Sequence, residues 1–375
     1  MFKPAGIFFC CALIFLAGCA TQPVPPSEVI SGSGLLMNSP LNWTNPAATN
    51  LFPPPAVQPV PPPVLPVRPP VTNPPPPRPA TPPVMTWTSL NTWAAAHGIG
   101  APRRLSNQPV AEYAVASRYG VMVLGIGSRE AAWNGVGINL GFAPEIIDGE
   151  VCLHGLDLAK NLEPLLCEPP LAFGTNRVIV IDPGHGGSNP GASSVLDGRL
   201  EKEFTLDTAL RLKPLLEAEG WTVFLTRSRD VYVSNLFRPF FTTAHHADVF
   251  ISLHFNSAAP DRKQAGLETY CFTPTGMPST ITREYSDPWS EKSTSNEFDA
   301  QNLQLAVKLQ AALPRAMGME DRGVRRVRYI EVLRGQNCPA MLIEGGYLSN
   351  PREAALIETP EYRQKLAQAI ADALK

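Results

Sequence analysis

The spacing of apolar residues predicts an α/β domain in the second half of the chain. From residue 177 on, short apolar runs suited to buried strands alternate with longer segments of helical spacing. Strands are expected at 178–182, 221–226, 249–253, 267–272 and 340–344, and helices at 201–219, 235–247, 298–317 and 361–374. Because strands and helices alternate, we expect residues 176–375 to form a three-layer α/β/α sandwich.

Pro214 lies inside the first of these helices. A proline in a helix interior costs ~3 kcal/mol, because it removes a backbone N–H and crowds the preceding turn. We therefore expect helix 201–219 to be kinked or split at this residue.

The segment 86–171 predicts a smaller α+β domain. Helical spacing in 87–97 places Leu90, Trp93 and Ala94 on one side. The remaining elements are expected as strands at 121–126 and 137–140, with the turn-prone pair Asn134-Gly135 between them, and a closing segment at 151–166.

The residues before this domain predict export followed by a spacer. Lys3 and the apolar run 7–16 are typical of a signal peptide, since the run is shorter than the ~20 apolar residues of a membrane-spanning helix. From 53 to 83, 17 of 31 residues are proline, which favours extended polyproline II over a packed core. We expect a signal at 1–18 and a tether at 19–85, with a ligand for proline-recognition domains as the alternative for the tether.

The tetrad Leu16-Ala17-Gly18-Cys19 resembles the lipobox of bacterial lipoproteins, in which the cysteine becomes the acylated first residue. The resemblance implies a lipid anchor on Cys19 that binds a membrane through its acyl chains. A chance cysteine in an ordinary signal peptide is the alternative. Because Ala20 rather than Asp follows, the expected location is the periplasmic face of the outer membrane of a Gram-negative cell.

Charge and cysteine content narrow the class of protein further. The formal net charge is -2 and charged residues make up 17% of the chain, so no strong field predicts a nucleic-acid partner. Beyond the signal and the anchor the cysteines are Cys152, Cys167, Cys271 and Cys338. In an oxidising compartment Cys152 and Cys167 could pair, and isolated buried thiols are the alternative. Cys152 and His154 could also ligate a metal, but packing is the preferred interpretation.

Polar residues stand where three predicted strands end. His185 follows the first strand of the α/β domain in a glycine-rich turn, His254 follows the third, and Glu344 ends the fifth. Ligands of open α/β sheets bind at the carboxyl ends of strands, so these side chains should meet at one rim. Two histidines and a carboxylate are a common ligand set for catalytic zinc. The carboxylate could be Glu201 or Glu344, and the other would then move the proton during hydrolysis.

Five motifs over 177–375 resemble, in their order and context, those of the bacterial zinc N-acetylmuramoyl-L-alanine amidases, which include division amidases and sporulation autolysins. The motifs are Asp-Pro-Gly-His-Gly-Gly at 182–187, Glu-Lys-Glu-Phe at 201–204, Ser-Leu-His-Phe-Asn at 252–256, Asp-Arg-Gly-Val at 321–324 and Ile-Glu-Gly-Gly-Tyr-Leu-Ser-Asn at 343–350. The resemblance implies a zinc exopeptidase-like fold. It also implies that His185, Glu201 and His254 bind one Zn²⁺ ion and that Glu344 is the catalytic acid and base. Tyr347 replaces a frequent Phe, which puts no catalytic role in doubt.

The implied activity is hydrolysis of the amide bond between N-acetylmuramic acid and L-alanine in peptidoglycan. The expected partners are peptidoglycan, a membrane through the lipid anchor, and a protein activator. One rival is a zinc carboxypeptidase or aminoacylase acting on free peptides. Another is a catalytically silent wall-binding lipoprotein, which the intact ligand set and Glu344 argue against.

Three further features carry weaker expectations. Asp182 either orients a metal ligand or caps the following turn. The polar stretch 273–296 is long for a loop within a domain and is expected to be a lid, a sugar-stacking loop around Tyr285 and Trp289, or a disordered segment. The region around Asn134-Gly135 in the small domain resembles domains related to the N-terminal domain of copper amine oxidases, a likeness that implies no copper.

Overall fold

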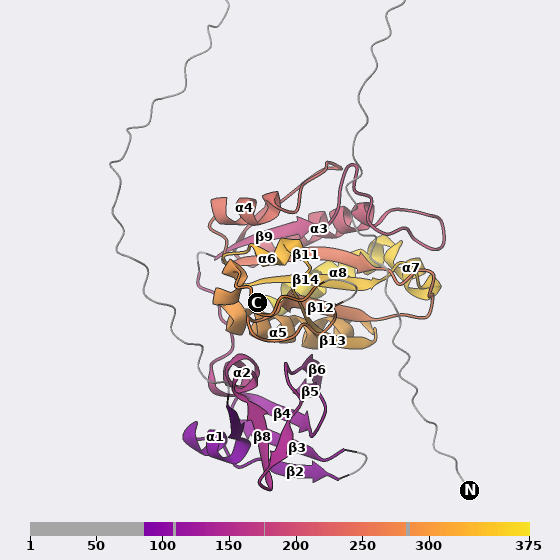
Figure 1. The fold of residues 1–375 in the computed structure, drawn as a ribbon. Helices are drawn as coiled ribbons and strands as arrows, with labels where there is room; N and C mark the ends of the chain where they lie inside the picture. Colours follow the sequence, from indigo (N-terminus) through magenta and orange to yellow (C-terminus); the bar gives the residue numbers. More distant parts are fainter. Residues whose placement is uncertain (1–85, 108–109, 176, 283–285) are drawn as a thin grey trace, which may run out of the picture. The chain divides into compact units, whose positions relative to one another are not determined.

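A computed structural model of the chain describes residues 86–107, 110–175, 177–282 and 286–375 (Figure 1). The expected signal peptide, Cys19 and the proline-rich tether lie outside the described residues. The described residues belong to one compact unit. The boundary that the sequence places between 171 and 176 therefore stays a prediction.

A six-stranded mixed sheet forms the centre of the second half of the chain, in the order β10-β9-β11-β14-β12-β13 (Figure 1). The strands are β9 (Arg177–Pro183), β10 (Trp221–Leu225), β11 (Val249–Asn256), β12 (Leu267–Phe272), β13 (Asp321–Val327) and β14 (Ala340–Tyr347). The first four in this order are parallel, whereas β12 is antiparallel to β14 and parallel to β13. The five predicted strands are confirmed. β13 was not predicted, because its arginine-rich sequence is not an apolar run.

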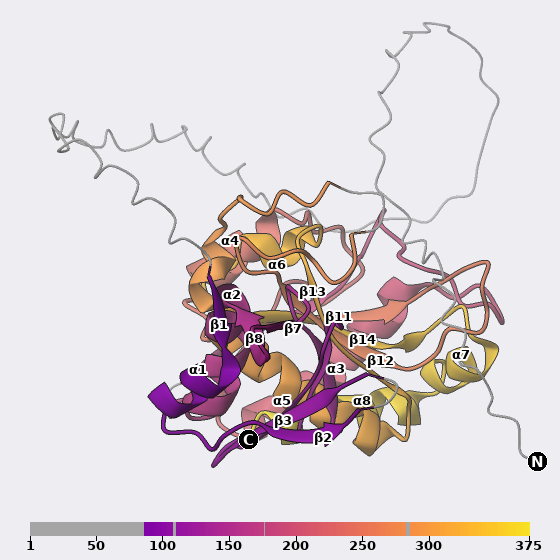
Figure 2. The ribbon, with the colours of Figure 1, turned by 60° about the horizontal axis from the view of Figure 1, so that its bottom comes forward.

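Helices cover both faces of this sheet, so the predicted three-layer architecture is confirmed. The helices are α3 (Glu201–Ala218), α4 (Phe237–Ala244), α5 (Asp299–Met317), α6 (Glu331–Arg334), α7 (Pro351–Ile357) and α8 (Pro360–Ala373). Apolar residues of α3, α5 and α8 pack against one face of the sheet, and α5 and α8 lie side by side (Figure 2). Apolar residues of α4 and α6 pack on the other face. No helix within the described ranges is both long and apolar enough for a membrane crossing.

Helix α3 runs without interruption through Pro214, so of the two predicted outcomes the split is wrong, and a kink stays a prediction. The proline leaves the carbonyl of Leu210 without its helical partner, but Leu210 is 45% exposed and solvent can satisfy that carbonyl. Packing of α3 on α8 and on the sheet opposes the local preference for a break.

The described residues of 86–171 form two small antiparallel sheets and three helical segments. The strands are β1 (Trp87–Ser89), β2 (Arg103–Ser106), β3 (Glu112–Ser117), β4 (Gly120–Gly125), β5 (Glu130–Trp133), β6 (Val136–Asn139), β7 (Glu145–Ile147) and β8 (Glu150–His154). The helices are α1 (Leu90–Ala96), α2 (Gly155–Asp157) and the wider η1 (Leu158–Cys167). Sheet orders are β2-β3-β4-β5-β6 and β1-β8-β7.

Local predictions in this segment are confirmed in part. Asn134 and Gly135 have φ values of 49° and 87° and form the two-residue turn between β5 and β6. The helix expected from Trp87 begins only at Leu90, because residues 87–89 pair with β8 as a strand. Leu90, Trp93 and Ala94 are buried on one side of that helix, as predicted.

The small sheets contact the large sheet at its β13 edge. Gly137 of β6 and Gly323 of β13 approach so closely that a Cβ on Gly323 would lie 2.6 Å from the carbonyl oxygen of Gly137. Arg326 donates to the carbonyl oxygen of Lys160 at 2.8 Å, and Gln304 donates to that of Pro164 at 2.6 Å. The small sheets thus cover an edge strand that would otherwise expose unpaired backbone groups.

The cysteines at 152, 167, 271 and 338 are free. Of the two alternatives drawn from the sequence, the structure has isolated thiols rather than a pair between Cys152 and Cys167.

Candidate active site

His185 lies in a turn in which three consecutive residues have positive φ angles. Its own φ is 63°, and the φ values of Gly186 and Gly187 are 122° and 56°. A Cβ on Gly186 would lie 2.3 Å from the carbonyl oxygen of Val231. The glycines after His185 are therefore required by the fold, because only glycine adopts such angles without strain and leaves room for the neighbouring loop.

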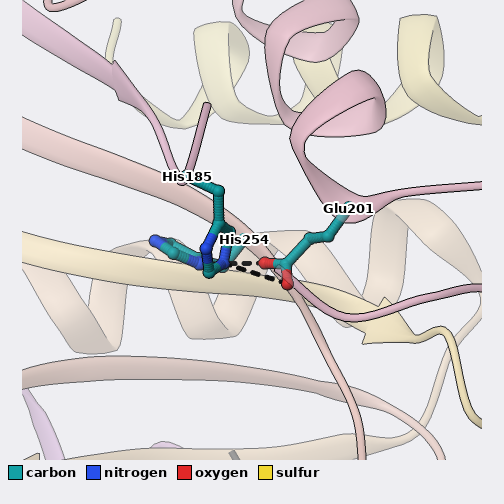
Figure 3. Close-up of side chains that lie close together, drawn as sticks. All are labelled: His185, Glu201 and His254. Atoms are coloured by element: carbon teal, nitrogen blue, oxygen red, sulfur yellow. Dashed lines mark hydrogen bonds and ion pairs between the residues drawn. The ribbon is translucent and has the colours of Figure 1, made fainter. Parts of the chain in front are cut away.

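Three side chains from three elements meet beside this turn (Figure 3). His185 follows β9, His254 lies near the end of β11, and Glu201 is the first residue of α3. Glu201 Oε2 lies 3.0 Å from His185 Nε2, and Glu201 Oε1 lies 2.9 Å from His254 Nδ1. One ligand atom from each residue lies within 4.8 Å of the others, so the three could hold a metal ion.

Backbone donors hold Glu201 in this position. Its Oε2 accepts a hydrogen bond from Ala192 N at 2.8 Å, and its Oε1 accepts one from Phe255 N at 3.1 Å. The side chain is 1% exposed. A buried carboxylate with two backbone donors is fixed in orientation, as a metal ligand must be.

The pKa of each of these three side chains depends on the charge of at least one of the other two. Burial alone would raise the pKa of Glu201, but the nearby His185 and His254 hold that pKa well below its usual range. Burial opposes the charged form of His185, yet Glu201 and a hydrogen bond to Asn189 raise the pKa of His185 above its ordinary value. Burial dominates at His254 and lowers its pKa. The cluster therefore contains an ionised carboxylate next to one imidazole that favours the neutral form.

The donor set fits zinc. His185 Nδ1 lies 3.0 Å from Asn189 Oδ1, the arrangement that fixes the ring of a metal-binding histidine. Nε2 of the same ring is buried and lies 3.0 Å from Glu201 Oε2, so these two atoms could serve the same metal ion. A Cβ on Gly184 would lie 2.3 Å from His254 Nε2, and one on Gly191 would lie 2.6 Å from Glu201 Oε2. Two imidazoles and a carboxylate, with glycines keeping space beside them, suit a tetrahedral zinc site with one open position.

A buried ion pair supports the turn that carries His185. Asp182 is 0% exposed and pairs with Arg238, which is 2% exposed. Asp182 also accepts hydrogen bonds from the hydroxyl groups of Thr226 and Ser252. Arg238 donates to the carbonyl oxygen of His185 at 3.2 Å. Of the two roles considered for Asp182, these contacts support the orienting one, exerted through Arg238.

Glu344 lies one strand away from His254. The Cα atoms of His254 on β11 and Glu344 on β14 are direct partners, and Glu344 is in turn the partner of Glu268 on β12. Directly paired residues point to the same face of a sheet, so these three side chains form a row across it. Glu344 is 4% exposed and Glu268 is 1% exposed. Glu268 was not predicted as a site residue. In the sequence it stands out only as an acidic residue inside an apolar strand.

Other candidates from the sequence lie outside this row. His154 accepts a hydrogen bond from Leu156 N and packs on Phe142 at a ring-centroid distance of 3.9 Å, which agrees with the packing interpretation. Asn350 is the N-cap of α7, where its side chain accepts hydrogen bonds from the backbone N–H groups of Arg352 and Glu353. The first part of the stretch 273–296 is attached to the end of β13. Arg328, which directly follows β13, donates hydrogen bonds to the carbonyl oxygens of Pro274 and Met277.

Trp289 in the same stretch is 47% exposed, and its ring lies 6.4 Å from that of Phe142. Tyr285, the other aromatic residue expected to stack on sugars, lies outside the described residues. The lid and sugar-stacking interpretations of this stretch stay predictions.

The chain resembles known amidases. A family model described as N-acetylmuramoyl-L-alanine amidase matches residues 179–375, more than half of the chain. A probable cell wall amidase LytH of Staphylococcus epidermidis is 38% identical over 200 residues, which cover 53% of this chain and 57% of that protein. Its Staphylococcus aureus counterpart is 36% identical over the same shares. The chain thus spans little more than half the length of these relatives.

Solved structures of similar sequence include two bacterial amidases. The N-acetylmuramoyl-L-alanine amidase of Clostridium difficile 630 is 29% identical, with a TM-score of 0.44, and the match covers 54% of this chain and 96% of that one. The catalytic domain of CwlV from Bacillus (Paenibacillus) polymyxa var. colistinus is 31% identical, with a TM-score of 0.43, over 53% of this chain and 96% of that one.

Proposed function

The chain belongs to the N-acetylmuramoyl-L-alanine amidase family, and from this premise we propose that it hydrolyses the amide bond between N-acetylmuramic acid and L-alanine in peptidoglycan. The observation that carries the proposal is the cluster of His185, Glu201 and His254 with Glu344 paired beside it. This arrangement combines a ligand set for zinc with a separate carboxylate, which are the two parts that metal-assisted amide hydrolysis requires.

We assign the metal site to His185, Glu201 and His254. A bound zinc ion would polarise the amide carbonyl and lower the pKa of a water molecule to about 7. Glu201 carries the negative charge of the ligand set, and its two backbone donors keep it from rotating away. Asn189 and the Asp182–Arg238 pair hold the His185 ring and its turn in place.

Glu344 is assigned the proton transfers. Its carboxylate accepts a proton from the attacking water and donates it to the amide nitrogen, so that the C–N bond breaks and the peptide leaves as an amine. Two observations support this role: Glu344 is the direct strand partner of His254, one strand spacing of ~4.8 Å away, and it is not among the three clustered residues. Its burial keeps competing solvent away from the carboxylate.

Digestion of purified sacculi tests the activity. We expect the purified protein to release peptides with a free amino-terminal alanine and to leave glycan strands without stem peptides, both identified by mass spectrometry. A protein that instead removes terminal residues from soluble peptides would be a zinc carboxypeptidase or aminoacylase. Binding to sacculi without cleavage, by protein that holds one zinc ion per chain, would contradict the proposed activity.

We further propose that the protein is exported and held in the cell envelope by a lipid on Cys19. The support is the tetrad Leu16-Ala17-Gly18-Cys19 after a short apolar run, together with a substrate that lies outside the cytoplasm. The proline-rich residues after the anchor would give the catalytic domain reach from the membrane surface toward the wall.

Replacing Cys19 with serine should release the protein from the membrane fraction, because no other attachment is expected. Metabolic labelling with a palmitate analogue should mark the wild-type protein and leave Cys19→Ser unlabelled. Cys167→Ser serves as a matched control and should keep both label and membrane association, since Cys167 is a half-buried thiol of the compact unit. An unlabelled wild-type protein would mean an ordinary secreted enzyme.

A further inference from the structure

A second charged cluster lies beyond Glu344 in the same row. Glu268 is 1% exposed, and two arginines share its carboxylate. Arg322 Nε donates to Oε1 at 2.8 Å, and Arg325 Nε donates to Oε2 at 3.1 Å. The hydroxyl groups of Tyr347 and Tyr270 also donate to this carboxylate. Burial alone would raise the pKa of Glu268, but the two arginines and Tyr347 hold that pKa below its ordinary value, so the carboxylate is charged.

Two guanidinium groups share the carboxylate of Glu268, and Glu344, the direct strand partner of Glu268, is the next carboxyl group in the row. Arg322 already contacts several protein groups, because it also donates a hydrogen bond to the carbonyl oxygen of Ala265 and its guanidinium lies 5.2 Å from the centre of the Tyr347 ring. Among the described residues, the Arg325 side chain donates through Nε alone, and this side chain is 25% exposed. Its two terminal amino groups, with four N–H donors, are therefore available to a ligand.

The cluster lies at a distance that suits the leaving peptide. Glu268 is two strands from His254, and strands are spaced ~4.8 Å apart, so the cluster is roughly 10 Å from the metal ligand along the row. An extended peptide spans ~3.3–3.6 Å per residue. A peptide whose scissile amide sits at His254 would thus bring its second or third residue to Arg325.

We propose that Arg325 binds a free carboxylate on the second or third residue of the stem peptide and so selects substrates in which that carboxylate is not amidated. The inference rests on the proposed amidase activity and names a specificity-determining residue for it. Arginine suits this role because its planar guanidinium binds a carboxylate through two parallel hydrogen bonds. Glu268 fixes Nε of Arg325 through one carboxylate oxygen, and Arg322 occupies the other oxygen of that carboxylate.

Steady-state kinetics with paired soluble muramoyl peptides tests the proposal. The two substrates of each pair differ only in whether the carboxylate of the second or of the third residue is free or converted to a carboxamide. Full-length wild-type protein should prefer the free carboxylate at one of these residues by on the order of 10-fold in kcat/KM. Arg325→Gln should bring that ratio close to one, chiefly by raising KM for the free carboxylate, with zinc content unchanged.

Arg262→Gln is the matched control. Arg262 is an exposed arginine on a separate pocket of about 260 Å³, lined also by Ser193, Ala259 and Ser349. Arg262→Gln should keep the wild-type preference for the free carboxylate over the carboxamide. If this preference is lost in Arg262→Gln and kept in Arg325→Gln, the proposal is overturned in favour of the pocket at Arg262. A wild-type protein that cleaves both forms equally would overturn it as well.

Two outcomes separate this inference from the proposed function. Cleavage of neither substrate nor sacculi by zinc-loaded wild-type protein would reject the amidase activity itself. Cleavage with an unchanged ratio in Arg325→Gln would reject only the carboxylate site. If Arg325→Gln does not retain zinc, Arg325→Lys is tested in its place. In that variant the kcat/KM ratio of the free carboxylate to the carboxamide should fall at least about threefold, because lysine offers a single point charge. An unchanged ratio in Arg325→Lys would reject the carboxylate site.

Discussion

Replacing Glu344 with glutamine is expected to lower peptidoglycan hydrolysis by ~10²–10⁴-fold or more, the usual contribution of positioned acid–base catalysis, while zinc stays at full occupancy. Glutamine has nearly the same shape but cannot accept the proton of the attacking water. Because Glu344 is paired with His254 across two strands and is not one of the three clustered ligands, its loss should leave the metal site intact. The variant should also still bind sacculi.

The contrasting change is Glu201→Gln. Glu201 contacts both histidines, so removing its charge should weaken zinc binding and slow hydrolysis through loss of metal, with partial rescue by excess zinc. Metal stoichiometry and turnover are measured for both variants at matched zinc. Glu203→Gln, a change at an exposed glutamate on the same helix, should behave as wild type. Should Glu344→Gln lose the metal and Glu201→Gln keep it without turnover, the two assigned roles are reversed.

Removal of a histidine ligand should have the largest effect of all. We expect His254→Ala or His185→Ala to reduce bound zinc from one ion per chain to near zero and hydrolysis to background, since a catalytic zinc site is built from three protein ligands. The loss should be larger than that from Glu344→Gln, because polarisation of the carbonyl and activation of water disappear together.

His246→Asn is the matched control for these variants. His246 is exposed, has a φ of 50°, and lies outside the ligand cluster. Asparagine tolerates that backbone angle, so the variant should fold normally. Zinc content measured by metal analysis and hydrolysis of sacculi should both equal those of wild type. A His185→Ala protein that turns over substrate without zinc would reject the site assignment.

Local sequence determined much of this molecule. Apolar runs of five or six residues predicted five of the six strands of the large sheet, because a strand buried on both faces needs a nearly continuous apolar sequence. The Asn134-Gly135 turn was also readable, since it depends on two adjacent residues. The motifs around His185, His254 and Glu344 marked the residues of the candidate site and, through family resemblance, their expected roles.

Tertiary structure decided what depends on residues far apart in the chain. Spacing alone left two carboxylates open as the third ligand, whereas the fold brings the first turn of α3 against both histidines and pairs Glu344 with His254 one strand away. Helix α3 continues through Pro214 because its packing outweighs a local penalty of ~3 kcal/mol. Strand β13 forms despite its arginines because β12 pairs with it and carries Glu268, whose buried carboxylate is the partner of Arg322 and Arg325.

The ion pair between Asp182 and Arg238 and the cluster around Glu268 have the same origin. Asp182 and Arg238 are 56 residues apart in sequence, and Glu268 meets its arginines from 54 and 57 residues away. A charge in an apolar strand has no local explanation, because burying it is costly unless a partner arrives from another element. The sequence by itself therefore marked the candidate residues for the chemistry, and only the tertiary structure determined which of them stand side by side.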